Sequence, residues 1–165
     1  MELNLCRDAE ASGSLKSEST SHVWLLETLE TTHALGEQLA LALPSRAILL
    51  LQGPLGAGKT SLVQGIAKGC GIDEPITSPT FALAQHYPQG QPPLVHLDLY
   101  RLEVPGSADE LFLQEEEESR ALGALMAVEW PERLGLELPE AWRLELGHDG
   151  EGRRAQLTPP RNCST

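Results

Sequence analysis

The sequence predicts an α/β fold, a three-layer sandwich whose central sheet is mixed but mostly parallel. Strand-like apolar runs alternate with segments of helical periodicity, which is typical of a sheet covered by helices. One apolar run, residues 46–52, enters a glycine-rich turn that leads directly into a helical pattern. Two pairs of neighbouring strand-like segments, within residues 81–99 and 142–157, look like hairpins and would add antiparallel strands to the sheet.

The first half of the chain should become ordered near residues 23–29. A helix is predicted next because leucines recur at every fourth residue, with Thr31 or Thr32 as its N-cap and Pro44 just after its end. In order, the elements predicted in this half are a helix at about 32–43, a strand at 46–52, a helix at about 59–68 that ends at Gly69 or Gly71, and a two-proline loop at 72–80.

The second half begins with one predicted hairpin and ends with another. Between them, Ser107 and Glu110 form the pattern of a capping box, so a helix should start there. That helix could be interrupted within the glutamate run at 115–118. The strands predicted in this half lie at 81–87, 94–99, 124–129, 142–146 and 154–157.

Length and charge limit the possible functions. A chain of 165 residues suits one domain with a sizeable core, which we assign to residues 23–158. The net charge of −12 argues against direct binding of a nucleic-acid backbone, because phosphate neutralisation needs clustered Lys and Arg. Any role near RNA would therefore act through a partner protein. The glutamate run is interpreted first as a solvated helix face and second as a docking patch for a basic partner.

The termini and the cysteines indicate the compartment. Residues 1–22 are polar and lack a secretory signal, so we expect a disordered extension there and a flexible tail at 159–165. The three cysteines are widely spaced and form neither a C-x-x-C pair nor a metal-binding pattern, which favours a reduced compartment. No apolar stretch approaches the roughly 18 residues of a membrane span. We therefore expect a cytoplasmic protein with no membrane partner.

Residues 53–60, GPLGAGKT, fill every fixed position of the phosphate-loop pattern G-x-x-x-x-G-K-[ST], and a buried strand precedes them. The glycines let the backbone wrap a phosphate chain, with the amide groups from about Gly56 to Thr60 pointing inward at the start of a helix. Lys59 can reach the β- and γ-phosphates, and the Thr60 hydroxyl can ligate Mg²⁺. The alternative is a plain glycine-rich turn between a strand and a helix.

Two acidic residues end apolar, strand-like runs and could complete such a site. Asp98 follows the run at 94–97, and Glu129 follows the run at 125–128. The carboxyl ends of buried strands border the ligand crevice of an open α/β sheet, so either carboxylate could meet the Mg²⁺ held by Thr60. Each could equally be a strand-end carboxylate that faces water.

Other residues near these segments are weaker candidates. Thr80, in the segment SPTF, could bring a hydroxyl to the γ-phosphate or to Mg²⁺, although a proline turn is the simpler interpretation. His96 lies two residues before Asp98 and should share its face, more plausibly as a structural histidine than as a catalytic base. Arg101 could pair with a carboxylate or a phosphate oxygen, and Trp130 could shelter the site or join the core.

Four short motifs follow one another along the chain, and the set is more specific than any one of them. They are GPLGAGKT at 53–60, SPTF at 78–81, HLDLYRL at 96–102 and VEWP at 128–131. Together they resemble the TsaE family (also called YjeE), bacterial P-loop ATPases of tRNA threonylcarbamoyladenosine biosynthesis. The similarity extends from about residue 32 to residue 155, and it implies the three-layer sandwich of a P-loop NTPase.

The resemblance implies binding of ATP and Mg²⁺, slow ATP hydrolysis, and association with the TsaB–TsaD pair, in which TsaD transfers the threonylcarbamoyl group to adenosine 37 of tRNA. It implies contact with tRNA only through that complex. By motif, Lys59 acts on the phosphates, Thr60 and Glu129 ligate Mg²⁺, Glu129 also orients water, and Asp98 resembles an outer-shell acid. The residues implied to contact the nucleotide are Thr32 near the adenine, Gly152 before the last strand, and Gly53, Leu55, Gly56, Ala57, Gly58, Lys59, Thr60 and Ser61.

Two other functions use the same kind of loop. A small-molecule kinase usually needs an arginine-bearing lid that closes over the transferred phosphate, and residues 102–118 are acid-rich and hold no arginine. A nucleotide-gated binding module with negligible turnover would differ from the ATPase only in rate.

Overall fold

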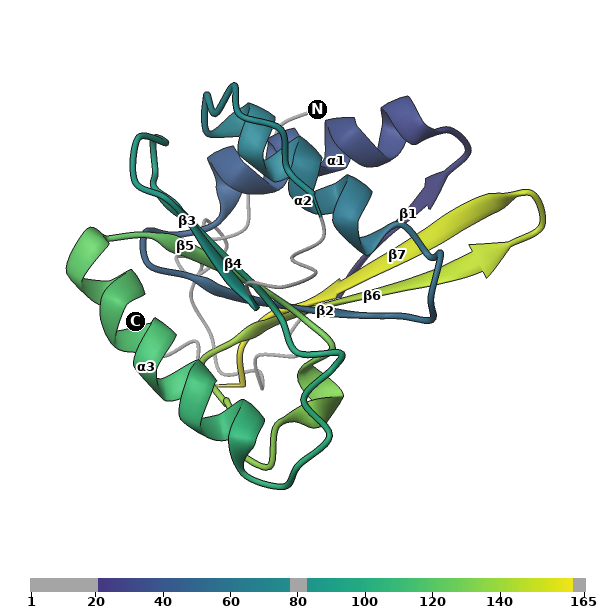
Figure 1. Ribbon diagram of the computed structural model, residues 1–165. Coiled ribbons are helices and arrows are strands. Elements are labelled where there is room, and N and C mark those ends of the chain that lie inside the picture. Colours follow the sequence, from purple (N-terminus) through teal and green to yellow (C-terminus); the bar gives the residue numbers. More distant parts are fainter. Residues whose placement is uncertain (1–20, 78–82, 162–165) are drawn as a thin grey trace, which may run out of the picture.

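One sheet forms the middle layer of the molecule (Figure 1). The computed structural model describes residues 21–77 and 83–161, and within them seven strands pair in the order β1-β7-β6-β2-β5-β4-β3. The strands are β1 (His22–Leu26), β2 (Ile48–Gln52), β3 (Ala84–Tyr87), β4 (Leu94–Asp98), β5 (Leu125–Glu129), β6 (Trp142–Asp149) and β7 (Gly152–Thr158).

The centre of this sheet is parallel and its edges are antiparallel. Strands β6, β2, β5 and β4 run in the same direction, whereas β3 pairs antiparallel with β4, and β7 pairs antiparallel with both β6 and β1. Both predicted hairpins are present, and the mixed, mostly parallel sheet is confirmed. Strand β1 was not predicted, because its five residues gain their partner only when β7 returns from the far end of the chain.

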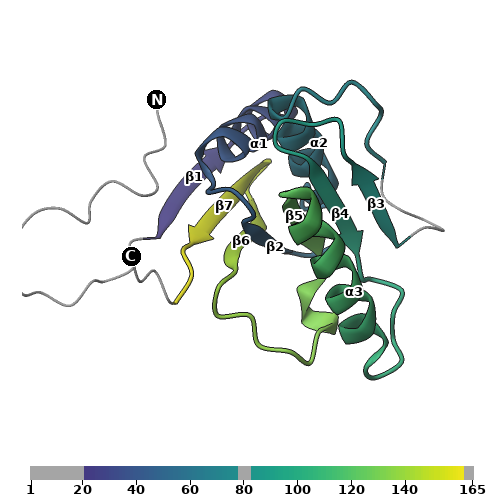
Figure 2. The ribbon, with the colours of Figure 1, turned by 90° about the vertical axis from the view of Figure 1, so that its left-hand side faces the viewer.

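Helices cover both faces of the sheet, which confirms the three layers (Figures 1 and 2). Helices α1 (Leu29–Ala42) and α2 (Lys59–Gly69) pack on one face, and α3 (Ser107–Leu122) packs on the other; a short 3₁₀ helix, η1 (Pro131–Arg133), follows β5. Strand β2 is buried from both sides, so its side chains alternate between the two cores. Leu49 and Leu51 belong to the α1/α2 core, and Leu50 belongs to the α3 core.

Of the three predicted helix starts, the one at Lys59 agrees with the structure and the N-caps of the other two are wrong. Helix α1 begins at Leu29, and its N-cap is Thr28, whose side chain accepts from the Thr31 amide while the Thr31 hydroxyl accepts from the Thr28 amide. Helix α3 begins at Ser107 with Gly106 as its N-cap. The Ser107 hydroxyl donates instead to the Val104 carbonyl, 2.7 Å away, so the predicted capping box does not form.

Helix α3 runs without a break through the glutamate run, contrary to the interruption considered above. The run is also not uniformly solvated. Glu115 is 7% exposed and contacts His86 of β3, whereas Glu117 and Glu118 are exposed. The turn of the helix carries Glu115 toward the sheet, and its burial is tolerated because it has a hydrogen-bonding partner.

No helix in the described ranges combines the length and the apolar character that crossing a membrane would need. Of the segment predicted as a disordered extension, only residues 21 and 22 are described, and His22 already starts β1. Of the predicted flexible tail, residues 159–161 are described; Pro160 is buried there, and the Arg161 amide donates to the Pro139 carbonyl at 3.0 Å.

Candidate functional site

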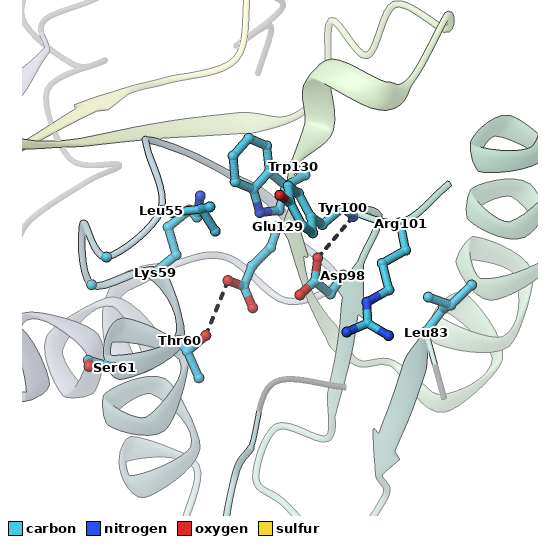
Figure 3. A pocket seen from close by; sticks show the side chains of 12 residues that line it. Leu55, Lys59, Thr60, Ser61, Leu83, Asp98, Tyr100, Arg101, Glu129 and Trp130 are labelled. Atoms are coloured by element: carbon cyan, nitrogen blue, oxygen red, sulfur yellow. Dashed lines mark hydrogen bonds between the residues drawn. The ribbon is translucent and has the colours of Figure 1, made fainter. Parts of the chain in front are cut away.

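A cavity of about 330 Å³ opens where the phosphate loop meets the carboxyl ends of β4 and β5 (Figure 3). This is the edge of a parallel sheet at which ligands bind in open α/β folds. Its lining comes from the loop and the start of α2, from the segments around β4, and from the end of β5. The lining residues are Leu55, Gly56, Gly58, Lys59, Thr60, Ser61, Leu83, Asp98, Tyr100, Arg101, Glu129 and Trp130.

The phosphate loop joins β2 to α2 in a conformation that only glycine adopts readily. Gly58 is the N-cap of α2 with φ of +102°, a left-handed value that disfavours residues with a Cβ. No side chain within residues 21–77 and 83–161 caps this helix end by a hydrogen bond. The first amide groups of α2 therefore remain available for an anion, and the helix dipole adds partial positive charge there.

Lys59 lines the cavity, and its side chain contacts the protein on two sides. Its Nζ donates to the Gly53 carbonyl and lies 3.7 Å from the centroid of the Trp130 ring. Burial lowers the pKa of Lys59 below 10.5, and the charges of Glu129, Glu132 and Asp98 act against that shift. The site thus presents a largely desolvated ammonium group, for which a phosphate oxygen is a matched partner.

The two predicted carboxylates lie side by side. Strands β4 and β5 pair in parallel register with Asp98 opposite Glu129. Glu129 is 2% exposed, and its Oε1 accepts a hydrogen bond from the Thr60 hydroxyl at 3.3 Å. Asp98 Oδ1 accepts from the Tyr100 amide at 3.0 Å (Figure 3).

The oxygen atoms of Thr60 and Glu129 suit Mg²⁺, which prefers hard oxygen ligands. Across residues 21–77 and 83–161, no group of three or more His, Cys, Asp or Glu could hold a metal ion. Mg²⁺ in a phosphate site needs only one or two protein ligands, because phosphates and waters supply the rest, so the Thr60 hydroxyl and the Glu129 carboxylate would be enough.

His96 contributes to this site indirectly. It is fully buried on β4, and its Nε2 lies 2.6 Å from Glu129 Oε2. The contact leaves Glu129 Oε1 directed at Thr60. This position is consistent with the prediction that His96 is a structural histidine on the same face as Asp98. The sequence did not indicate that the partner of His96 is the Glu129 carboxylate.

Two aromatic side chains form one wall of the cavity. Trp130 follows β5 in a left-handed backbone conformation, with φ of +59°. The centroid of its ring lies 4.8 Å from the centroid of the Tyr100 ring. Non-glycine residues in this conformation are uncommon and cluster at functional sites. Trp130 therefore belongs to the site as well as to the packing around it. Sequence reasoning did not single out Tyr100, although its place two residues after Asp98 could have indicated it.

The remaining predicted residues lie at different distances from the cavity. Gly53 and the buried Ala57 belong to the loop but do not line the cavity. Thr32 is buried behind the loop, since a Cβ on Gly58 would lie 3.9 Å from its methyl group. Gly152 starts β7 against the Leu26 backbone, outside the cavity lining. Thr80 lies outside the described residues.

Comparisons with known proteins point to one family. The family model described as threonylcarbamoyl adenosine biosynthesis protein TsaE matches residues 26–156. The tRNA threonylcarbamoyladenosine biosynthesis protein TsaE of a Synechocystis species is 52% identical over 114 residues, which cover 67% of this chain and 71% of that relative. The protein of the same name from a Nostoc species is 43% identical over 136 residues, 82% of this chain and 83% of the relative. A crystal structure of Bacillus subtilis YdiB is similar with a TM-score of 0.68 and 27% identity, covering 85% of this chain and 86% of that one.

Proposed function

This chain belongs to the TsaE family, and we propose that it is a P-loop ATPase that binds Mg²⁺–ATP and hydrolyses it slowly in support of tRNA threonylcarbamoyladenosine biosynthesis. One observation carries the proposal: the Thr60 hydroxyl of the phosphate loop donates to the buried Glu129 carboxylate at 3.3 Å, in the cavity that Lys59 also lines. A hydroxyl, a carboxylate and a lysine around an open helix N-terminus are the parts that a nucleoside triphosphate with Mg²⁺ requires.

Each residue has a role that follows from its position. The amide groups at the start of α2 and Lys59 hold the β- and γ-phosphates. Thr60 and Glu129 would hold Mg²⁺, which when bound neutralises charge on the phosphate oxygens. The Glu129 carboxylate also orients the attacking water and accepts hydrogen bonds from it. Asp98, next to Glu129 on the neighbouring strand, acts in the outer shell.

The partners we propose are TsaB- and TsaD-type proteins, with tRNA contacted only through their complex. The net charge of −12 supports an indirect route to tRNA, because an acidic surface repels the phosphate backbone. In this proposal ATP hydrolysis by the chain energises or resets the complex. The chain does not transfer the threonylcarbamoyl group itself.

The kinase alternative has less support. Much of the arginine-free segment at 102–118 belongs to α3, a helix that packs on the sheet through the fully buried Phe112. A helix fixed in the core cannot close over a transferred phosphate as a lid does.

Phosphate release from Mg²⁺–ATP tests the proposal, measured for the chain alone and with a TsaB–TsaD pair. We expect slow release alone and faster release with the pair. Lys59→Ala should lose nucleotide binding and turnover. Lys68→Ala is the matched control, since the Lys68 side chain is 75% exposed at the far end of α2 and pairs with Glu37.

Four results would contradict the ATPase assignment. If the chain does not bind ATP, or if Lys59→Ala keeps full ATP affinity and turnover, the proposed nucleotide site is wrong. Transfer of the γ-phosphate to a metabolite would favour the kinase. Tight ATP binding without phosphate release, alone and with the pair, would favour the nucleotide-gated binding module.

A further inference from the structure

A hydrogen bond joins Gly56, a residue of the phosphate loop that lines the cavity, to the β6–β7 hairpin. Arg153 is the second residue of β7, and its Nη2 donates to the Gly56 carbonyl at 3.2 Å. The two residues are 97 positions apart in the sequence. No motif in the sequence indicates this contact.

The contact fixes one peptide unit of the loop from both ends. The Gly56 carbonyl accepts from Arg153, and the amide of Ala57, in the same peptide unit, donates to the Pro54 carbonyl at 3.1 Å. Because a peptide unit is planar, holding its oxygen and its N–H together sets its orientation. The orientation of this unit in turn sets the direction in which the following amides of the loop face the phosphates.

Among the described residues, few other contacts restrain the loop at Gly56. Residues 54–56 are exposed, and a Cβ added to Gly56 would meet nothing within 4 Å. The described side chains therefore do not pack around the loop tip, and a hydrogen bond from a charged donor can contribute much to keeping the tip in one conformation.

The arginine itself stands on a rigid support. At Arg153, strand β7 is paired on both sides, with His148 of β6 and with Leu26 of β1. The preceding Gly152 lies directly against β1, since a Cβ there would be 2.9 Å from the Leu26 carbonyl oxygen. A guanidinium anchored in this way holds the loop at a fixed distance from the sheet.

We propose that Arg153 is a positioning residue that holds the phosphate loop in its nucleotide-binding form through the Gly56 carbonyl. This inference rests on the proposed nucleotide site and adds the residue that preorganises it. Removal of the arginine lets the loop tip sample other conformations, and binding must then order it again. Removal of Arg153 should therefore lower the nucleotide affinity and leave the rate at which the bound complex hydrolyses ATP unchanged.

The test compares Arg153→Ala with Arg154→Ala in the full chain, by calorimetric titration of ATP and ADP with Mg²⁺ and by steady-state phosphate release. Arg154 is the matched control, because it is the adjacent residue of the same strand, carries the same charge and is exposed. We expect Arg153→Ala to weaken the binding of both nucleotides by roughly 5- to 10-fold, which is about the net contribution of one solvent-exposed hydrogen bond. Its kcat should stay within about twofold, and Arg154→Ala should match the wild type.

A second variant and a stability measurement separate positioning from folding. Arg153→Lys keeps a donor and the charge, so it should recover part of the affinity. Chemical unfolding should show Arg153→Ala folded, with a free energy of unfolding close to that of Arg154→Ala.

Each other outcome overturns the inference. If Arg153→Ala and Arg154→Ala lose nucleotide affinity equally, the cause is a long-range effect of the removed charge. If Arg153→Ala loses affinity for ATP but not for ADP, the arginine contacts the γ-phosphate directly. If the wild type binds nucleotide, Lys59→Ala does not, and Arg153→Ala binds like the wild type, only the positioning role fails. If the wild type binds no nucleotide, the proposed function fails together with it.

Discussion

Replacing Glu129 in two ways separates its chemical role from its structural one. Its Oε1 accepts from the Thr60 hydroxyl, and its Oε2 contacts buried His96 at 2.6 Å. Glu129→Gln keeps the shape and can pair with either tautomer of His96, since an amide offers both a donor and an acceptor. Glu129→Ala removes both contacts.

The two variants should lose activity alike but differ in stability. Each removes the carboxylate, so turnover should fall by about 10²- to 10³-fold, as expected when a preorganised group at the reacting phosphate is lost. No described residue partners His96 Nδ1, so the alanine variant leaves both ring nitrogens unpaired in a fully buried side chain. An unsatisfied buried group costs about 1–3 kcal/mol, whereas the glutamine variant should stay within about 1 kcal/mol of the wild type.

Phosphate release and thermal unfolding of the three proteins measure these effects. At about 2–4 °C per kcal/mol for a chain of this size, the alanine variant should melt several degrees below the glutamine variant. Both remain folded, because domains of this size are stable by about 5–15 kcal/mol. The reasoning is refuted if Glu129→Gln keeps full turnover, or if the alanine and glutamine variants melt at the same temperature.

Three further predictions concern the fold and the cysteine. Thr28→Ala removes the N-cap of α1 and should lower the free energy of unfolding by about 1 kcal/mol in urea titration; no change would show that the cap is dispensable. Phe112→Ala should cost about 3–5 kcal/mol, and Leu113→Ala on the same helix, where Leu113 is 53% exposed, should cost much less; equal losses would argue against α3 packing on the sheet. Burial raises the pKa of Cys70 from 9.0 to about 11, so the native state holds this proton more tightly than the unfolded state. Its contribution to stability should fall as pH rises from 9.0 to about 11, and peptide mapping after iodoacetamide treatment at pH 8 should find Cys70 unmodified unless the protein is denatured.

The phosphate loop could be predicted from the sequence because its chemistry is local. Eight consecutive residues hold the glycines, the lysine and the hydroxyl, and the preceding apolar strand places them. Asp98 and Glu129 could be found for a related reason, since an acid after an apolar run marks a strand end. Their adjacency depended on the strand order, which the sequence does not show.

The errors in the predicted elements arose at helix starts and at strand pairings, where a local sequence pattern does not determine the structure. The leucine spacing shows the buried stripe of α1 but not its first turn, because Leu29 is 55% exposed and lies off the stripe. Gly106, with φ of +87°, starts α3 one residue before the serine that the capping-box pattern selects. Pairings across the whole chain, such as β1 with β7 and Arg153 with Gly56, carry no local signal at all.

A crystal structure with a non-hydrolysable ATP analogue and Mn²⁺ tests the central claim most directly, because Mn²⁺ can replace Mg²⁺ and gives an anomalous signal. The account predicts the triphosphate wrapped by residues 53–60 and an anomalous peak within coordination distance of Thr60 Oγ1 and the Glu129 carboxylate. A triphosphate bound elsewhere, or a metal peak remote from both residues, would contradict it.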